Sequence, residues 1–150
     1  MQVMPIRTRV FREGEDLFKF LDETLPSIRD RSIVAVTSKI VALSEGRTVI
    51  IENDRTKEEW IQRESEYTVR GKYAWLSLKD GVVLSSAGID ESNANGKLIL
   101  LPQDSFRSAE NIRAYLQKRF GVKDIGIIVT DSRAVFLRAG AMGIAIGYAG

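Results

Sequence analysis

A long polar connection between two apolar runs constrains the possible folds of this chain most strongly. Residues 81–84 and 98–101 are both strongly apolar, and their length and β-branched content predict two strands. A simple hairpin needs only about two to five residues between its strands, and residues 85–96 form a longer connection. Gly88 and Gly96 permit positive φ angles in this loop. Its polar side chains with oxygen atoms are Asp90, Glu91, Ser92, Asn93 and Asn95. The loop is therefore a candidate ligand site, or a solvated turn whose side chains bond their own backbone.

A second polar segment follows a predicted buried strand. Residues 32–36 predict that strand, and Thr37, Ser38 and Lys39 come directly after it, at the start of a short helix that closes at Gly46. Backbone N–H groups, hydroxyls and an ammonium group at such a position can bind a phosphate. The glycines of a P-loop are absent, and a helix cap with a surface lysine fits the same residues.

A third polar segment repeats this arrangement. Residues 125–129 predict another buried strand, which leads into Thr-Asp-Ser-Arg at residues 130–133. An acid and a hydroxyl at the carboxyl end of a buried strand are typical of a ligand site in an open sheet. Asp131 could equally be the cap of a helix.

The rest of the chain predicts helices packed on strands. Helices are expected from Gly14 to Leu25, from a capping box at residues 56–59 to about Val69, and after residue 102 up to Gly121. Strand-like segments are residues 1–10, 47–51 and 73–78, with a hairpin turn at 79–81. With 150 residues and 44% hydrophobic content, the chain is long enough for one α+β domain with a mixed or antiparallel sheet.

The composition excludes several classes of chemistry. The chain has no Cys and no His, which excludes thiol nucleophiles, Cys-ligated zinc and Ser-His-Asp triads within it. A hard cation such as Mg²⁺ or Mn²⁺ with oxygen ligands fits the remaining side chains. The net charge is only +2 without a basic block, so no nucleic-acid partner is expected. The sequence has neither an apolar stretch of transmembrane length nor a signal peptide, so no membrane contact and a cytoplasmic location are expected.

The last residues are apolar and small. Residues 140–150 are rich in Gly and Ala, and small residues of this kind suit close packing of backbones. A domain rarely ends on an uncovered apolar segment. We therefore expect a single domain over residues 1–150 that is truncated at its C-terminal end, or whose end is covered by another subunit.

Three motifs together resemble a known family. They are Val-Thr-Ser-Lys-Ile-Val-Ala-Leu-Ser-Glu-Gly-Arg at 36–47, Ala-Gly-Ile-Asp-Glu-Ser-Asn at 87–93, and Ile-Val-Thr-Asp-Ser-Arg at 128–133, with Arg138-Ala-Gly and a closing Ala-Ile-Gly-Tyr-Ala-Gly. In these stretches the chain resembles the coenzyme F420-0:γ-glutamyl ligase family, and more closely its bacterial branch of folate-metabolism γ-glutamate ligases. The second motif is the most specific of the three.

The resemblance implies an amide-bond ligase. Such an enzyme uses GTP or ATP to activate a carboxylate as an acyl phosphate, which the amine of L-glutamate then attacks. The expected partners are Mg²⁺ or Mn²⁺, L-glutamate, a small-molecule acceptor of the F420, folate or pterin type, and a second copy of the chain in an intertwined homodimer. The expected fold is that of the F420 γ-glutamyl ligases.

The resemblance also implies site residues. Asp90 and Asp131 match metal ligands, with Ser132 assisting. The positions that match nucleotide contacts are Thr8, Arg9, Val10, Phe11, Ser38, Lys39 and Asn93. No residue is assigned as catalytic.

The chain also departs from the family pattern. Leu43 stands where the family has a lysine, and residues 131–135 lack the glycine of the family's Asp-Thr-x-Gly-Arg segment. The family also continues beyond Gly150, with further metal and nucleotide contacts there. The alternatives to a ligase are a non-catalytic nucleotide- or metal-binding module and a dimerisation domain whose loop acids are only solvated.

Overall fold

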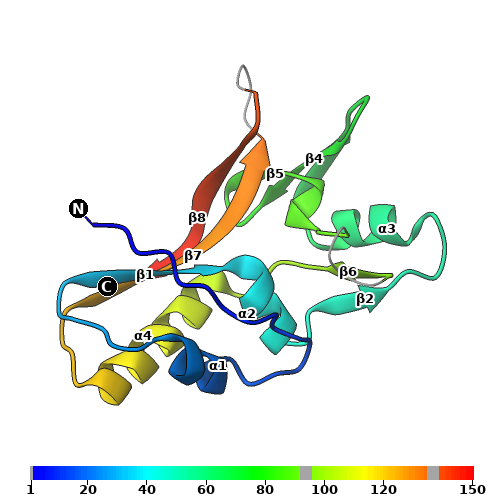
Figure 1. The fold of residues 1–150 in the computed structure, drawn as a ribbon. Helices are drawn as coiled ribbons and strands as arrows, with labels where there is room; N and C mark the ends of the chain where they lie inside the picture. Colours follow the sequence, from blue (N-terminus) through cyan, green and yellow to red (C-terminus); the bar gives the residue numbers. More distant parts are fainter. Residues whose placement is uncertain (1, 92–95, 135–138) are drawn as a thin grey trace.

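The computed structural model describes residues 2–91, 96–134 and 139–150, and it has a mixed α/β architecture (Figure 1). Its largest sheet contains β1 (Ser32–Thr37), β7 (Ile125–Ala134) and β8 (Ala141–Ala149), in the order β1-β7-β8. Strand β1 runs parallel to β7, and β8 runs antiparallel to β7. The sheet is therefore mixed, as expected for an α+β chain.

Three helices pack on one side of this sheet (Figure 1). They are α1 (Leu17–Thr24), α2 (Ser38–Ser44) and α4 (Ser105–Phe120). Their apolar stripes meet the inward residues of β1 and β7 in a buried core. The core residues are Leu17, Leu21, Leu25, Val36, Val41, Ala109, Ile112, Leu116, Val122, Ile125, Ile127 and Val129.

A second group of elements has its own core. It comprises β2 (Thr48–Ile50) paired with β6 (Lys97–Ile99), the antiparallel sheet β3 (Tyr67–Arg70), β4 (Trp75–Lys79) and β5 (Val82–Ser85), the helix α3 (Thr56–Arg63) and the 3-10 turn η1 (Ser86–Gly88). Its buried residues are Ile61, Ala87, Ile89, Leu98 and Leu100. The two apolar runs that flank the long polar loop thus form β5 and β6, which belong to different sheets.

The predicted capping box at Thr56 is wrong. Thr56 is buried, and its hydroxyl accepts hydrogen bonds from the backbone N–H groups of Glu52 and Asn53 in the preceding turn. The helix predicted to reach Val69 ends at Arg63, because Tyr67–Arg70 pairs with β4 instead. Tyr, Thr and Val are strong strand formers, so sheet pairing prevails over helix extension here.

Two other boundaries differ from the predictions. Residues 2–10 form no regular strand, and α1 begins at Leu17 with Asp16 as its cap rather than at Gly14. Strand β7 continues past Val129 to Ala134, so residues 130–133 lie within the strand. The hairpin turn at 79–81 is confirmed, with positive φ at Asp80 and Gly81 between β4 and β5.

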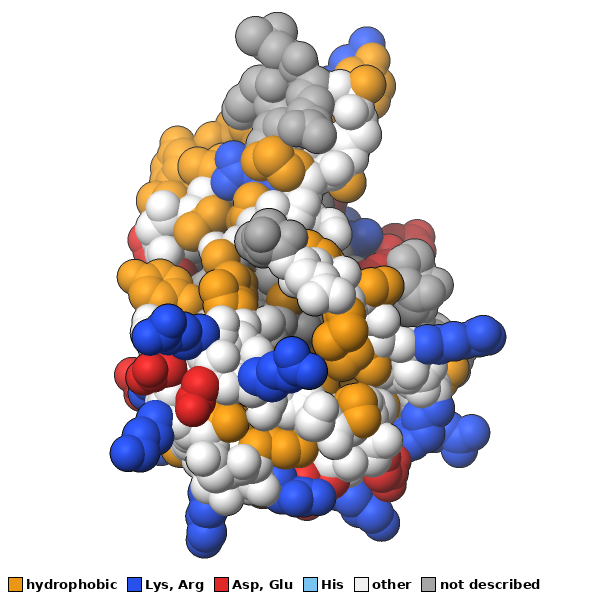
Figure 2. Space-filling view, turned by 60° about the vertical axis from the view of Figure 1, so that its left-hand side comes forward, with side chains coloured by type: hydrophobic (Ala, Val, Ile, Leu, Met, Phe, Trp, Pro, Cys, Tyr) orange, Lys and Arg blue, Asp and Glu red, His pale blue; other side chains and the backbone are white. Residues whose placement is uncertain are grey.

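The face of the large sheet opposite the helices carries exposed apolar side chains. Ile33 of β1 is 68% exposed and Tyr148 of β8 is 61% exposed. The pairing register places both backbone positions on the same face, because Tyr148 lies opposite Ile128, which pairs with Ala35. The Tyr148 ring, at the edge strand β8, also packs edge-on against Phe106 of α4, with 5.2 Å between the ring centres. Figure 2 shows one face of the molecule, on which patches of apolar side chains lie among basic and acidic ones.

None of the helices in the described part of the chain combines the length and the apolar character that a bilayer crossing requires.

Candidate functional site

Three segments that are distant in the sequence meet at the carboxylate of Asp131. The Ser38 hydroxyl donates a hydrogen bond to Asp131 Oδ1 over 2.7 Å. The Lys39 ammonium group donates to the same oxygen over 3.2 Å and to the carbonyl oxygen of Gly88 over 2.6 Å. We call Ser38, Lys39, Gly88 and Asp131 the Asp131 cluster. It brings together one residue or more from each of the three polar segments of the sequence.

The register of the parallel pair explains why Ser38 meets Asp131. Thr37, the last residue of β1, lies opposite Thr130 of β7. Ser38 directly follows Thr37, and Asp131 directly follows Thr130, so Ser38 and Asp131 lie side by side at the end of the β1–β7 ladder. Ser38 is fully buried at the start of α2, which fixes its hydroxyl beside the carboxylate.

The ion pair in this cluster is largely shielded from solvent. The side chain of Asp131 is 8% exposed and that of Lys39 is 19% exposed. Charges removed from water interact strongly with their partners, and an uncompensated charge there is costly. The cluster is therefore a fixed electrostatic feature rather than a chance surface pair.

A strained turn presents the Gly88 carbonyl to Lys39. Ser86, Ala87 and Gly88 all have positive φ, which is rare for residues with a side chain. The Ser77 hydroxyl accepts a hydrogen bond from the Ala87 N–H over 3.1 Å and holds the turn. A Cβ atom on Gly88 would lie 2.9 Å from the side chain of Leu101, so glycine is required by space as well as by φ. Strained backbone of this kind concentrates at functional sites.

Asp90 follows this turn, and its backbone position is fixed. Its N–H donates to the carbonyl of Ile99 over 2.9 Å, and its carbonyl accepts from the Ile99 N–H over 2.8 Å. Asp90 is half-buried and follows Gly88 by two residues in the sequence, and the predicted metal contact of its carboxylate stays a prediction. Asn93 lies outside the described residues, so its predicted nucleotide contact stays a prediction.

Arg133 is a residue whose role the sequence did not indicate. Residues two apart on a strand share a face, so Arg133 lies on the same face of β7 as Asp131, and Ser132 lies on the other. The Nε atom of Arg133 is buried and has no hydrogen-bond partner among the described residues. Buried donors are nearly always paired in complete structures. The predicted metal contact of Ser132 stays a prediction.

Residues 8–11 lie against α1. The Arg9 guanidinium pairs with Glu15 and with Glu23 and lies 5.2 Å from the centre of the Phe20 ring, against which Phe11 packs edge-on. The hydrogen bond from Arg9 lowers the pKa of Glu15. No hydrogen bond or ion pair between described residues joins this segment to the Asp131 cluster. The predicted nucleotide contacts of Thr8, Arg9, Val10 and Phe11 therefore stay predictions.

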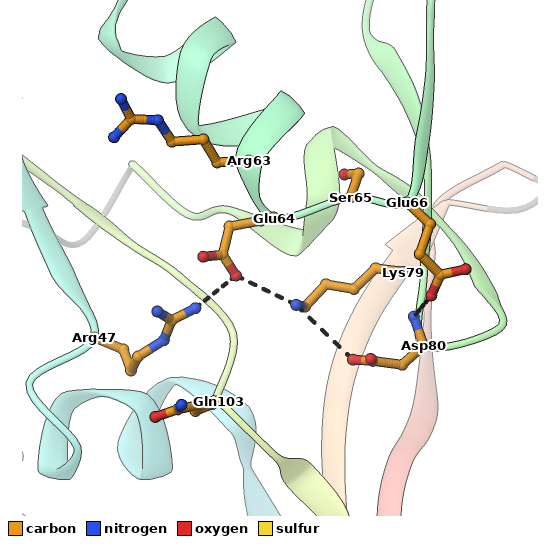
Figure 3. A pocket seen from close by; sticks show the side chains of 8 residues that line it. All are labelled: Arg47, Arg63, Glu64, Ser65, Glu66, Lys79, Asp80 and Gln103. Carbon is orange, nitrogen blue, oxygen red and sulfur yellow. Dashed lines mark hydrogen bonds and ion pairs between the residues drawn. The ribbon is translucent and has the colours of Figure 1, made fainter.

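A polar hollow of about 410 Å³ lies at the junction of β2, α3 and β4 (Figure 3). Its lining residues are Arg47, Arg63, Glu64, Ser65, Glu66, Lys79, Asp80 and Gln103. Sequence reasoning missed it, because the lining residues come from separate elements without a shared motif. The only sequence feature that could have pointed to this hollow is Arg47, which ends the first motif.

The fold and the site together define the class of protein to which the chain belongs. The chain is a mixed α/β protein in which a shielded carboxylate, a hydroxyl and an ammonium group meet at the end of a parallel strand pair. Oxygen ligands and a cation in this arrangement are typical of sites for phosphate and hard metal ions.

Comparison with known proteins gives the family. The sequence model of the F420-0:gamma-glutamyl ligase family matches residues 5–150, and the chain belongs to this family. It is 31% identical to the coenzyme F420:L-glutamate ligase of Methanopyrus kandleri and 31% identical to that of Archaeoglobus fulgidus, each over the whole chain. The chain covers 66% of the first relative and 67% of the second, so it spans about two thirds of their length. A third relative of the same name, from Methanococcus maripaludis, is 28% identical over 82% of the chain, and the match covers 56% of that relative's length.

Proposed function

We propose that this chain is the nucleotide- and metal-binding part of a γ-glutamyl ligase. The enzyme would join L-glutamate to a carboxylate of an F420-, folate- or pterin-like acceptor at the expense of GTP or ATP. The observation that carries the proposal is the Asp131 cluster, because it unites the three motifs at one shielded carboxylate. The names of the relatives, which are F420:L-glutamate ligases, support the same reaction class.

The donor atoms fit a hard divalent cation that is shared with phosphates. Asp131 supplies a carboxylate, Ser38 a hydroxyl, and Asp90 a second carboxylate on the adjacent loop. Among the described residues, no group of three or more acidic side chains could hold an ion by itself. Mg²⁺ commonly binds through one or two carboxylates and completes its shell with waters and substrate phosphates. When bound, Mg²⁺ or Mn²⁺ would neutralise phosphate charge during phosphoryl transfer.

The chain's own residues have separate tasks in this proposal. The Lys39 ammonium group and the Arg133 guanidinium place positive charge where the nucleotide phosphates would lie. The acceptor carboxylate attacks the γ-phosphorus, and the nucleoside diphosphate leaves. The amine of L-glutamate then attacks the carbonyl carbon of the acyl phosphate, and phosphate leaves as the amide forms. Such transfer depends mainly on positioning and charge, so the absence of Cys and His is no obstacle.

A homodimer is part of the proposal. The exposed face of the large sheet, with Ile33 and Tyr148, is apolar enough to support contact with a second copy. Sedimentation of the protein over a range of concentrations tests this point, and a monomer at every concentration would contradict it.

Calorimetry with Mg²⁺ and GTP or ATP tests the function. We expect binding that requires the metal and that falls by about tenfold or more in Asp131→Asn and in Lys39→Met, because each change removes a charge-assisted contact. Asp54→Asn and Lys72→Met are matched controls at exposed positions. Unchanged binding in both cluster variants would contradict the proposal. Nucleotide turnover only with glutamate and an acceptor would separate a ligase from a non-catalytic binding module.

A further inference from the structure

The two side-chain oxygens of Asp131 have different surroundings. Oδ1 accepts a hydrogen bond from the Ser38 hydroxyl over 2.7 Å and another from the Lys39 ammonium group over 3.2 Å. A carboxylate oxygen offers about two lone-pair sites for such contacts, so the protein itself uses both sites of Oδ1. The structure gives Oδ2 no hydrogen bond or ion pair with any described residue. Oδ2 is therefore the oxygen that is open to a ligand on the side of the described residues.

The Ser38 hydroxyl acts through Asp131. Ser38 is 0% exposed, and a serine hydroxyl has a single hydrogen to donate, which here goes to the carboxylate. The donor–acceptor distance of 2.7 Å lies in the short range of charge-assisted hydrogen bonds. No surface of Ser38 is left for direct contact with a ligand in this structure. The hydroxyl therefore serves a bound ion by fixing the carboxylate rather than by touching the ion.

The Lys39 ammonium group is held at two points. It donates to Asp131 Oδ1 and also to the carbonyl oxygen of Gly88 over 2.6 Å, which leaves one of its three N–H groups for another partner. The terminal torsion of an aspartate side chain is otherwise soft, and a turn about it exchanges the two oxygens. Here such a turn breaks two hydrogen bonds, so the orientation of the Asp131 carboxylate is fixed.

We propose that Ser38 and Lys39 are positioning residues that make Asp131 a metal ligand through Oδ2 alone, and that this selects a small octahedral cation over Ca²⁺. The proposal rests on the proposed function, in which Asp131 binds a divalent ion. Mg²⁺ requires near-ideal octahedral geometry, into which a single carboxylate oxygen fits, and Mn²⁺ shares this oxygen chemistry. Ca²⁺ accepts carboxylates through one or both oxygens in a larger, more flexible shell. Occupation of Oδ1 therefore denies Ca²⁺ the two-oxygen mode.

Binding of Mn²⁺ alone, with Ca²⁺ as competitor, tests the proposal. Electron paramagnetic resonance measures the free Mn²⁺ in each mixture. In Ser38→Ala one site of Oδ1 becomes free, and the preference for Mn²⁺ over Ca²⁺ should fall by about tenfold, as is usual when a partner that orients a metal ligand is removed. Ser38→Thr keeps the hydroxyl and should keep the preference. Ser44→Ala is the matched control, because the Ser44 hydroxyl also lies in α2 but donates to the carbonyl oxygen of Val41.

The ratio of the two affinities separates positioning from a general structural role. A variant that is only less stable binds both ions less well and leaves the ratio as it is in the parent chain. A Mn²⁺ preference in Ser38→Ala equal to that in Ser44→Ala would therefore overturn the proposal, even where both affinities fall.

Lys39→Met is an independent test at the other neighbour of Oδ1, and it decides the question if Ser38→Ala does not fold. Removal of the ammonium group changes the repulsion of both divalent ions alike, so this effect cancels in the ratio. We expect the preference for Mn²⁺ to fall in Lys39→Met and to be kept in Lys39→Arg. A preference that Lys39→Met retains in full would overturn the proposal.

Failure of this proposal is distinguishable from failure of the proposed function. A parent chain that binds nucleotide with Mn²⁺ but does not bind Mn²⁺ alone would overturn the fixed Oδ2 ligand and leave the proposed function standing. An unchanged ion preference in the Ser38 and Lys39 variants would do the same. Absence of metal-dependent nucleotide binding in the parent chain would contradict the proposed function and this inference together.

Discussion

Among single residues, Gly88 shows how a conformational need and a packing need coincide. Its φ of 68° lies in the left-handed region, and Leu101 fills the space where a Cβ atom would stand. The sequence predicted the conformational freedom of this glycine. The contact with Leu101 could not be predicted, because Leu101 follows β6, which lies in a different sheet from the strand β5 that precedes the turn.

Gly88→Ala should destabilise the protein more than Gly121→Ala does. Both glycines have nearly the same positive φ, but a Cβ on Gly121 would meet nothing within 4 Å. The shared backbone cost is about 1–2 kcal/mol, and the clash with Leu101 adds about 1–3 kcal/mol at Gly88 alone. Urea unfolding of both variants measures the difference. Equal losses would show that Leu101 moves aside freely.

The members of the Asp131 cluster were recognisable singly but not as a group. Ser38, Lys39 and Asp131 stood out because each follows or ends a predicted strand. Their meeting depends on the pairing of β1 with β7 in one particular register, across 93 residues of sequence for Ser38 and Asp131. Arg133 stood at the end of the third motif, but the sequence assigned it no role, because its position matters only when β7 continues past Val129.

At the scale of elements, α3 shows where sequence patterns failed. The capping box at Thr56 looked like a helix start, yet the buried hydroxyl accepts from two N–H groups of the preceding turn. Helix propensity also favoured extension to Val69. Pairing of Tyr67–Arg70 with β4 is a long-range interaction, and local periodicity does not report it.

Thr56→Val should therefore destabilise the protein by about 1 kcal/mol, because two backbone donors lose their acceptor in a turn that is only partly buried. Thr56→Ser keeps the hydroxyl and serves as the matched variant. Chemical unfolding should rank the parent and the serine variant close together, with the valine variant clearly below them. Similar losses in the two variants would mean that the methyl group, and not the hydroxyl, stabilises this turn.

The segment before α1 should respond to acid. The hydrogen bond from Arg9 holds the pKa of Glu15 below its ordinary value of 4.5. The stabilisation is therefore complete above about pH 4.5 and is lost as the pH falls through the lowered folded-state pKa. We expect the amide signals of residues 8–11 to change in this acid range before the core unfolds.

Glu15→Gln should remove this acid transition, because the amide does not titrate and pairs less strongly with Arg9. Glu91→Gln, in the exposed pair with Lys57, is the control and should leave it unchanged. An acid transition of residues 8–11 that persists in Glu15→Gln would contradict the assignment.

At the scale of the whole molecule, two cores meet at the candidate site. The first core contains α1, α2, α4, β1 and β7, and the second contains α3, β2, β6 and η1. Lys39 of the first group binds Gly88 of the second, so the Asp131 cluster lies at their junction. The sequence predicted the α+β class and most elements, because periodicity and turn residues are local. It did not predict the separation of β5 and β6 into different sheets, which only tertiary pairing decides.

The position of the metal–nucleotide complex is the most direct test of the central claim. Mn²⁺ bound with GTP or ATP broadens the amide signals of nearby residues in nuclear magnetic resonance spectra. We predict broadening centred on residues 37–39, 87–90 and 130–133, with little effect in Asp131→Asn. Broadening that is centred elsewhere, or that is the same in Asp131→Asn as in the parent chain, would contradict the assignment of the Asp131 cluster as the nucleotide- and metal-binding site.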